Sequence, residues 1–535
     1  MKVQWTYLKE LLQKHKDTEF GRKYGFGSIR SIREYQERVP IHTWEEVSPY
    51  VVEVKKGNQT ALFPKNEKLI MFAQTSGTTG QPKYVPFTKT SYRHYKKYWD
   101  HMWAYVAREL PWKPVGKALY FPGDPQEGYF GNIPYGAITA KAYQQQGPLK
   151  RALYSYPYQI SKIKDYNLRY YTIMRIALEK HITFIPIANP STIITLFKVA
   201  RERADEIIED IQNGQLRDAD RMPEEFKRLI LKKLKPNPRR AYELKRILRE
   251  TGDFLPRDYW KWPVLVICFA SGPLRLYLKQ LEQYLGNFGL LDFGLLASEG
   301  RFSFPMALVQ QQEGCCLTLE SNFFEFIPED EIENPNPKAL TLDQCELGKR
   351  YFIIITNYSG LYRYNISDVV EVTGFYGKVP LITFCNKGKH FSNITGEKLS
   401  EIQVTESVRR AGEKIGYRLV DFVVCLHWDE NRPSYSLLKS FHNDDNFEQL
   451  QEFVNLVEKQ LMLMNVEYHS KRQSLRLGPL ILKIVQGEDY QNYEKKKQRA
   501  SRNLAQYKRT FLVNDPSFEE QFRFINEISS SMGPS

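Results

Sequence analysis

A Ser/Thr/Gly segment followed by a lysine is the part of this chain best suited to chemistry. It reads TSGTTGQPK from Thr75 to Lys83 and lies between two apolar runs. Its glycines let backbone N–H groups approach an anion without a Cβ in the way, its hydroxyls can donate further hydrogen bonds, and Lys83 adds a full positive charge. These groups suit the phosphates of a nucleotide. The glycine spacing matches neither the P-loop nor the dinucleotide-binding motif, and a polar hairpin turn is the alternative interpretation.

Two carboxylates and two lysines further along the chain can complete a nucleotide site. Glu299 follows a strand-like run in the sequence ASEG, where a carboxylate can hold a magnesium ion that bridges phosphate oxygens. Asp368 ends the sequence LYRYNISD and can accept hydrogen bonds from both ribose hydroxyls. Lys398, in GEK, and Lys508, in QYKR, are candidate functional cations. Taken singly, the four residues also fit a first helical turn, a turn after a strand, a hairpin tip and a charged surface.

Together, and in this order, the segments resemble the acyl-acid amido synthetases, the plant enzymes that conjugate auxin and jasmonate to amino acids, with their bacterial relatives. This family belongs to the adenylate-forming superfamily. The resemblance runs from about Thr18 to Lys508, nearly the whole chain. Its motifs are TSGTTGQPK, WPVL at 262, ASEG at 297, GLYRY before Asp368, FCNKGKHFSNITGEKLSE and AQYK near the end.

The resemblance implies an α/β protein with the adenylate-forming fold. Its large N-terminal domain, residues 1–385, would contain several sheet and helix subdomains and the ATP and acyl sites. A short, polar and basic segment at 386–390 is expected to be a hinge, and residues 391–535 a small, mobile α+β lid. The length of the chain, 535 residues, also favours more than one core.

The same resemblance assigns the site residues and the cofactors, ATP and Mg²⁺. Glu299 would ligate magnesium, Asp368 would bind the ribose, and Lys398 and Lys508 would come from the C-terminal domain for adenylation. The residues expected around the phosphates are Thr75, Ser76, Thr78, Thr79, Lys83 and Ser298.

The acyl pocket is expected to be lined by a helix at 90–110 and by the segment 131–136. The predicted pocket residues are Tyr95, Trp99, Met102 and Tyr135. Along the helix, aromatic residues and Met102 recur at spacings of three and four, which places them on one broad face. Packing in the core is the alternative for some of them.

Two positions depart from the family pattern. Leu295 stands where the plant enzymes have a tyrosine that stacks on adenine, so Phe293 or another aromatic residue is a candidate replacement. Asn365 and Ser367 replace residues of the family's YRxGD sequence, and serine adopts a positive φ less readily than glycine. The role of Asp368 is kept because its distance from GLYRY is unchanged.

The function implied is an ATP-dependent ligase that adenylates a carboxylic acid and joins it to an amine, and the expected amine is an amino acid. One alternative passes the acyl group to coenzyme A or to a carrier protein through the same adenylation step. The others are a binding protein without catalysis and a nucleic-acid-binding protein. Small acid and amine substrates are the expected partners.

Composition restricts the remaining classes. The net charge is +14, and half of it comes from residues 221–250, which hold eleven basic and four acidic residues with leucines and isoleucines at helical spacing. We interpret this stretch as two solvated helices broken at Pro236 and Pro238, and we expect no nucleic acid partner. No apolar run approaches the roughly 20 residues of a membrane span, so a cytoplasmic protein without membrane insertion is expected. The six cysteines have no CxxC spacing, which favours reduced thiols without a metal.

The coarse pattern of elements is an alternation of helices and strands. Helices are expected at 1–60, 89–110, 168–181, 191–212 and 274–285, and strands on both sides of the Ser/Thr/Gly segment, in ITFIPI, at 262–269, at 289–296 and through 321–373. In the C-terminal part, helices are expected at 399–411 and 446–464, with strands at 419–427, 434–440 and 478–485.

Overall fold

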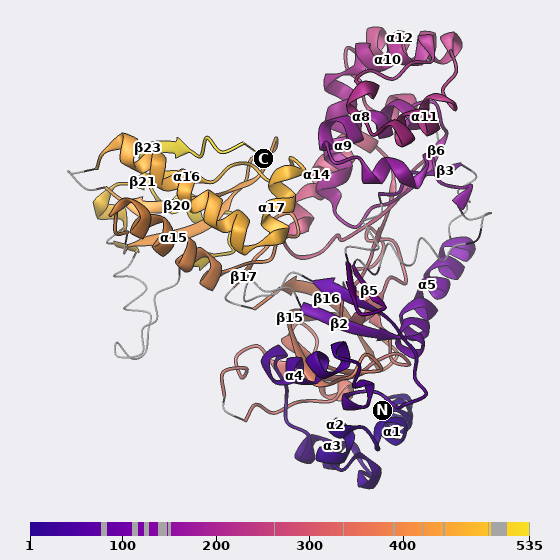
Figure 1. The fold of residues 1–535 in the computed structure, drawn as a ribbon, viewed down its shortest axis with the longest axis vertical. Coiled ribbons are helices and arrows are strands. Elements are labelled where there is room, and N and C mark those ends of the chain that lie inside the picture. The colour runs from indigo at the N-terminus through magenta and orange to yellow at the C-terminus, as the bar shows by residue number, and fades with distance from the viewer. Residues whose placement is uncertain are drawn as a thin grey trace. The chain divides into compact units, whose positions relative to one another are not determined.

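A computed structural model describes most of the chain, which divides into two compact units (Figure 1). The first unit is formed by Met1–Thr75 and Lys83–Cys385, and the second contains the chain from Asn386 onwards. The described residues are 1–75, 83–109, 116–121, 128–136, 138, 147, 151–261, 263–334, 336–388, 391–419, 421–441, 445–490, 492–493 and 511–533. Four predicted site residues, Ser76, Thr78, Thr79 and Lys508, lie outside them, as do residues 389 and 390 of the predicted hinge.

The chain begins with four helices, as predicted for residues 1–60. They are α1 (Lys2–His15), α2 (Glu19–Lys23), α3 (Ile32–Arg38) and α4 (Trp44–Lys55). Side-chain caps fix two of the starts: Thr18 Oγ1 accepts from Gly21 N at 2.9 Å, and Ser31 Oγ accepts from Glu34 N at 3.1 Å. Leu8, Leu11 and other apolar residues of these helices are buried in a core of the first unit that they share with strands β1 (Leu69–Thr75), β13 (Phe323–Pro328) and β14 (Arg350–Asn357).

A four-stranded sheet carries both ends of the Ser/Thr/Gly segment. Its order is β2-β1-β5-β4, with β1 (Leu69–Thr75), β2 (Lys83–Thr88), β4 (Gly128–Phe130) and β5 (Ile133–Gly136). β1 and β2 are antiparallel, and Thr75 pairs with Lys83 at their ends. The long helix α5 (Lys89–Glu109) follows β2 directly, as predicted.

A second sheet of four strands is parallel, and its crossover segments contain helices. Its order is β3-β6-β7-β8, with β3 (Lys117–Ala118), β6 (Ile182–Pro186), β7 (Leu265–Cys268) and β8 (Gly289–Asp292). All four residues of β7 are buried, as expected for a parallel strand covered on both faces. The helices are α8 (Tyr166–Ala177), α9 (Pro190–Glu202), α10 (Ala204–Asn213), α11 (Glu224–Leu231), α12 (Pro238–Thr251), α13 (Pro256–Tyr259) and α14 (Leu278–Leu285), and most of them form one group in Figure 1.

Two of these helices differ from the prediction. The single helix expected at 191–212 is divided at Arg203, whose φ of −112° and ψ of 29° end α9 before α10 begins. The expected helix at 274–285 starts as a 3₁₀ turn, Gly272–Tyr277, in which Gly272 has a φ of 59°. The α/β class predicted from the sequence is confirmed.

The third sheet has six strands and carries Asp368. Its order is β11-β12-β16-β15-β14-β13, with β11 (Ser303–Phe304), β12 (Cys315–Leu317), β13 (Phe323–Pro328), β14 (Arg350–Asn357), β15 (Leu361–Tyr376) and β16 (Val379–Asn386). Phe352 pairs with Val369 and Ile354 with Asn365, so residues 366–368 of β15 face only Ile353. This bulge changes the direction of the strand at the predicted ribose ligand.

The second unit contains a five-stranded sheet with helices on one face. Its order is β22-β19-β20-β21-β23, with β19 (Phe422–His427), β20 (Ser434–Ser440), β21 (Ile481–Val485), β22 (Leu512–Val513) and β23 (Phe524–Ser529). α15 (Glu401–Ile415), α16 (Phe447–Met464) and α17 (Val466–Gln473) share a core with Leu437 and Leu482 of the sheet. Val423, Leu438 and Val485 belong to a separate core with Tyr490 and Phe518.

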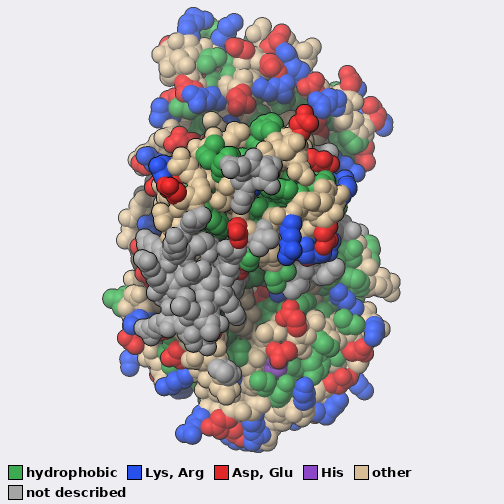
Figure 2. All heavy atoms as spheres, turned by 90° about the vertical axis from the view of Figure 1, so that its left-hand side faces the viewer, with side chains coloured by type: hydrophobic (Ala, Val, Ile, Leu, Met, Phe, Trp, Pro, Cys, Tyr) green, Lys and Arg blue, Asp and Glu red, His purple; other side chains and the backbone are tan. Residues whose placement is uncertain are grey.

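Acidic partners accompany Arg221, Lys227, Arg240 and Arg246 of the 221–250 stretch. Lys227 pairs with Asp220, Arg240 with Glu243 at 2.7 Å, and Lys261 reaches the same Glu243 at 2.8 Å. Figure 2 shows acidic and basic side chains interspersed on the face that it presents. None of the described helices combines the length and apolar character needed to cross a membrane.

Candidate nucleotide and acyl site

The turn that carries Glu299 lies against the end of β1. Two short antiparallel strands form it, β9 (Leu296–Ala297) and β10 (Gly300–Arg301). Ser298 Oγ donates to the carbonyl of Gln74 at 3.3 Å, next to Thr75 and therefore next to its strand partner Lys83. The structure thus brings Ser298 and both ends of the Ser/Thr/Gly segment together.

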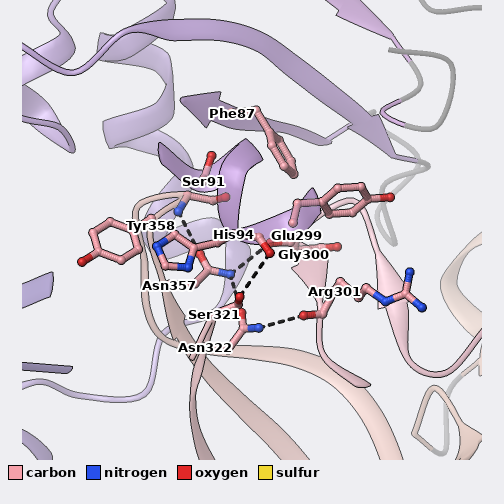
Figure 3. Close-up of a pocket in the computed structure, with 12 residues that line it drawn as sticks. Phe87, Ser91, His94, Glu299, Gly300, Arg301, Ser321, Asn322, Asn357 and Tyr358 are labelled. Atoms are coloured by element: carbon pink, nitrogen blue, oxygen red, sulfur yellow. Dashed lines mark hydrogen bonds between the residues drawn. The ribbon is translucent and has the colours of Figure 1, made fainter. Parts of the chain in front are cut away.

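A pair of asparagine side chains holds the backbone around Glu299 (Figure 3). Asn357 Nδ2 donates to the Glu299 carbonyl at 3.0 Å and to Asn322 Oδ1 at 3.1 Å, while Asn322 Nδ2 donates to the Arg301 carbonyl at 2.8 Å. The Glu299 side chain is half-buried, and the described residues give its carboxylate no hydrogen bond or ion pair. The backbone is therefore fixed while the carboxylate stays available to a ligand.

Glu299 and Asp368 both lie near the buried hydroxyl of Tyr364. Burial raises the pKa of Tyr364 well above its usual value, and the nearby charges of Glu299, Glu45 and Asp368 raise it further. Asp368 itself is only 3% exposed. Two predicted site carboxylates that are 69 positions apart in the sequence thus share one neighbourhood.

The turn before Asp368 is built without the family's glycine. Ser367 has a φ of 61°, the left-handed conformation that glycine adopts most easily, and its N–H donates to Asn365 Oδ1 at 2.8 Å. Asn365 N in turn donates to the carbonyl of His42 at 3.0 Å. The two departures from the family pattern therefore act together, because the Asn365 side chain closes the turn in which Ser367 is strained.

A buried ion pair ties this strand to the N-terminal helices. Arg363 Nη2 donates to Glu325 Oε1 at 2.9 Å, and Arg363 Nη1 donates to the carbonyls of Gln36 at 2.8 Å and Val39 at 2.6 Å. Gln36 Nε2 also donates to Glu325 Oε1 at 2.9 Å. The segment YQERVP thus helps to position the strand that carries Asp368.

A small pocket lies where β2, α5, the Glu299 turn and the end of β14 meet (Figure 3). Phe87, Ser91, His94 and Tyr95 line it on one side, and the backbone of 299–301 with Asn357 on the other. Its volume of ≈ 20 Å³ holds about one water molecule. This pocket is therefore too small for a nucleotide.

Three of the four predicted pocket residues gather around an arginine. The Trp99 ring lies under the Arg301 guanidinium, with 4.4 Å from the ring centre to Cζ, and Met102 Sδ is 3.8 Å from Nη2. Tyr95 packs edge-on against Phe87, with 5.9 Å between ring centres. All three come from α5, as predicted.

Tyr135 belongs to a different aromatic group. Its ring centre is 4.8 Å from that of Phe130 and 5.2 Å from that of Tyr84, and the Nζ of Lys55 lies 3.8 Å from the Tyr84 ring centre. Among the described residues, no ring contact joins Tyr135 to Tyr95 or Trp99. The structure does not bring all four predicted pocket residues into one group.

Phe293, the candidate replacement for the adenine-stacking tyrosine, is a core residue. It is buried, and its ring centre lies 5.6 Å from those of Trp99 and Phe269. Leu295 is also buried. Phe293 therefore packs with Trp99, one of the residues predicted to line the acyl pocket.

Lys398 lies in the second unit, on a turn fixed by its neighbour. The buried Glu397 carboxylate accepts from Ile394 N at 2.6 Å and from Thr395 N at 2.7 Å, and Lys398 follows with a φ of 49°. Burial alone would raise the pKa of Glu467, but Lys471, with smaller effects of Lys398 and Arg476, lowers it. Lys398 is half-buried.

Sequence reasoning missed Arg301, Asn322 and Asn357. The two asparagines sit in separate strand segments whose approach to Glu299 depends on the sheet, so no local spacing marks them. Arg301 directly follows the ASEG motif, which indicates a nucleotide site and gives no sign of a separate role for the arginine. Its strong signal, a charge within an apolar core, exists only in three dimensions.

The described residues fit a magnesium ion carried by a nucleotide better than a metal held by the protein alone. Among them, no group of three or more His, Cys, Asp and Glu side chains could hold a metal. Magnesium in nucleotide sites is usually bound by one or two carboxylates together with phosphates and waters. A single available carboxylate at Glu299 matches that requirement.

Two plant relatives and one solved structure that resemble this chain are named as synthetases that join an acid to an amino acid or as an amido synthetase. An Oryza sativa subsp. japonica protein named jasmonoyl-L-amino acid synthetase GH3.5 is 25% identical over 90% of this chain and 87% of its own length. An Arabidopsis thaliana protein named indole-3-acetic acid-amido synthetase GH3.10 is 24% identical over 91% of this chain and 88% of its own length. A solved structure of the GH3.15 acyl acid amido synthetase has a TM-score of 0.64 at 19% identity and covers 100% of this chain and 95% of its own. The predicted class, an amido synthetase with the adenylate-forming fold, is confirmed.

The family can be stated as well. The sequence matches the GH3 family N-terminal domain over residues 1–290, the GH3 family central domain over 315–387 and the GH3 family C-terminal domain over 402–517. The chain belongs to the GH3 family.

Proposed function

We propose that this chain uses ATP and Mg²⁺ to adenylate a carboxylic acid and then transfers the acyl group to the amine of an amino acid. The observation that carries the proposal is the match to all three GH3 domains along the chain. The names of the relatives, which specify conjugation of an acid to an amino acid, support the same reaction. The acid and the amino acid are not specified by the proposal.

The reaction has two balanced steps. A carboxylate oxygen of the acid bonds to the α-phosphorus of ATP, and the bond from that phosphorus to pyrophosphate breaks. The amine nitrogen then bonds to the acyl carbon, the bond from that carbon to AMP breaks, and the nitrogen loses a proton. Negative charge builds up on phosphate oxygens in the first step, so the main demand on the protein is electrostatic.

The proposed roles follow the positions of the residues. The end of β1 with Thr75, the start of β2 with Lys83, and Ser298 support the phosphate side, together with Ser76, Thr78 and Thr79 of the connecting segment. Glu299 is the proposed ligand of magnesium. The positive charge of magnesium would offset the negative charge of the phosphates. Asp368, at the bulge of β15, is the proposed ribose ligand.

The C-terminal part has a separate proposed role. Residues 386–390 act as a hinge and residues 391–535 as a lid, and Lys398 and Lys508 supply positive charge for adenylation. We propose no nucleic acid partner, and the ion pairs of Lys227 and Arg240 in the basic stretch 221–250 support this. A cytoplasmic location and small-molecule partners complete the proposal.

The test is acid-dependent exchange of labelled pyrophosphate into ATP, followed by identification of the product with amino acids or coenzyme A. We expect exchange that requires Mg²⁺ and an amide product. A thioester product would favour the coenzyme A alternative, and no exchange with aryl, indolyl or fatty acids would contradict the proposal. Glu299→Gln should lower the exchange rate and weaken its magnesium dependence, while Glu331→Gln, remote from the described site, should change neither.

A further inference from the structure

Arg301 is a buried cation without a carboxylate partner among the described residues. It is 1% exposed, and its side chain points away from the asparagine pair that binds its carbonyl (Figure 3). Nη2 donates to the Phe293 carbonyl at 3.2 Å, but Nε and Nη1 have no hydrogen-bond partner. The carboxylate of Asp292, which is half-buried, accepts from Gly294 N at 3.0 Å and forms no ion pair with Arg301.

Two further unsatisfied donors lie beside this guanidinium. The indole N–H of Trp99 is buried without a partner, and its ring is the one stacked under Arg301. The hydroxyl of Tyr95 is also buried without a partner. Burial raises the pKa of Tyr95 to about 12, and the neighbouring charge of Arg301 acts in the opposite direction. Burial lowers the pKa of Arg301 to about 10, so both the hydroxyl and the guanidinium carry their protons at neutral pH.

This combination of donors is unusual for a folded core. Buried polar groups in native proteins are nearly always hydrogen-bonded, and exceptions call for a cause. Here three neighbouring side chains offer N–H and O–H groups, and apart from Arg301 Nη2 these groups have no hydrogen-bond partner. A carboxylate is acceptor-only, with two oxygens that can bind an arginine and further donors at once.

The rest of the surroundings are apolar. Met102, Phe184, Leu265, Ile267 and Phe293 form one core, with Trp99 packed against it. Such a wall suits the hydrocarbon or aromatic body of an organic acid and does not suit a nucleotide's phosphates. A single cation within an aromatic and aliphatic wall matches a ligand with one anionic end.

We propose that Arg301, with the Tyr95 hydroxyl and the Trp99 indole N–H, binds a carboxylate of the acid substrate. The inference rests on the proposed function, because it takes the acid to be the ligand, and it makes Arg301 a specificity-determining residue. The carboxylate can be the one that reacts or a second one on the same acid. The alternative is that Arg301 only packs on Trp99.

The experiment compares wild type, Arg301→Met and Arg301→Lys as full-length proteins. Equilibrium binding by calorimetry and pyrophosphate exchange are measured with three monocarboxylates, benzoate, indole-3-acetate and octanoate, and two dicarboxylates, terephthalate and suberate. Arg275→Met, which removes an exposed arginine paired with Glu313, is the matched control. Tyr95→Phe and Trp99→Phe remove one donor each and keep the rings.

We expect Arg301→Met to raise Kd and KM for the acid about tenfold or more, with a smaller change in kcat, and Arg301→Lys to restore part of the loss. Tyr95→Phe and Trp99→Phe should give smaller increases. If monocarboxylates show the effect, Arg301 binds the reacting carboxylate, and if only dicarboxylates show it, Arg301 binds the second one. Thermal stability without ligand should stay equal or rise, because an unpaired buried charge is removed.

Unchanged Kd and KM for every acid in Arg301→Met would overturn the inference and leave Arg301 a packing residue. This failure differs from failure of the proposed function. Binding of acids that depends on Arg301 without any pyrophosphate exchange would contradict the reaction and support the carboxylate site. Acid-dependent exchange that ignores Arg301 would support the reaction and contradict the site.

Discussion

Two buried arginines of the first unit differ in what surrounds them. Arg363, 5% exposed, donates through Nε and Nη2 to Glu325 and through Nη1 to two backbone carbonyls. Arg301, 1% exposed, has a single hydrogen bond to a carbonyl and contacts with a ring and a sulfur. The same side chain is thus part of a closed structural network in one place and an open set of donors in the other.

The difference indicates which region is built for stability and which for a ligand. A charge whose partners are all supplied by the protein gains nothing from a ligand. A charge without partners costs stability in the free protein and favours any ligand that neutralises it. The Arg363 network holds the strand of Asp368. Arg301 instead contacts Trp99 and Met102, two residues of the predicted acyl pocket.

The largest effect is expected for Arg363→Met. It leaves the Glu325 carboxylate buried without its cation, so the free energy of unfolding should fall by about 3–5 kcal/mol. Urea unfolding measures the change, and the double variant Arg363→Met/Glu325→Met should recover most of it. A loss below about 1 kcal/mol would remove the contrast with Arg301, whose replacement is expected to cost no stability.

Burial of an ionisable group also predicts a pH effect at His15, whose ring packs against those of Phe63 and Tyr362. It is 2% exposed, and burial lowers its pKa to about 4, although its hydrogen bond to the Leu11 carbonyl at 2.9 Å opposes the shift. Between pH 6.5 and 4 the imidazole is protonated in the unfolded chain and neutral in the folded chain. The free energy of unfolding should therefore fall by about 3 kcal/mol as the pH drops from about 6.5 to about 4.

Unfolding curves of His15→Gln across this pH range check the assignment. The slope should become smaller but not vanish, because burial also lowers the pKa of His94 to about 4. His101→Gln, at an exposed position of α5, is the control and should keep the full slope. An unchanged slope in His15→Gln would show that the imidazole is not held neutral.

A smaller effect is expected for Asp368→Ala, and it separates the two regions functionally. Ribose hydrogen bonds are present in both ground and transition states, so the loss of about 1.5–3 kcal/mol should appear mainly in KM for ATP. KM should therefore rise roughly 10- to 150-fold, while kcat changes less. KM for the acid should stay constant, the reverse of Arg301→Met. Combined in one protein, the two effects should add; unchanged ATP affinity in folded Asp368→Ala would remove the ribose assignment.

The elements and the family motifs could be predicted because their signals are local. Hydrophobic periodicity indicated α5, and a short motif placed Glu299 close to a strand end, where the structure has it. Asp368 was expected to follow a strand, but it lies at the bulge in the middle of β15. The fold class followed from the alternation of helices and strands and from the resemblance. Helix boundaries were less certain, and the break at Arg203 has no Gly or Pro to mark it.

The Arg301 group could not be predicted, because it depends on packing between distant segments. Arg301 and Met102 are 199 positions apart and meet only when α5 lies against β10. Tyr135 shows the same limit in reverse, since an aromatic residue in a family segment packs with Tyr84 and Phe130 instead. Pairing of donors with acceptors is a property of the folded chain, and no spacing rule reveals it.

The smallest effect is expected for Ser367→Gly, which tests backbone strain on the strand that also carries Arg363. A residue with a Cβ costs about 1–2 kcal/mol in the left-handed conformation that Ser367 adopts, whereas glycine loses about 0.5–1 kcal/mol of chain entropy on folding. The free energy of unfolding should therefore rise by about 0.5–1 kcal/mol, measured by urea unfolding. The same change at Ser48, inside α4, should lower it, because the helical backbone there gives glycine no advantage. KM for ATP should not change, because the hydrogen bond from the N–H of residue 367 to Asn365 remains and Asp368 keeps its position. If Ser367→Gly lowers the free energy of unfolding as much as Ser48→Gly does, the turn is not strained.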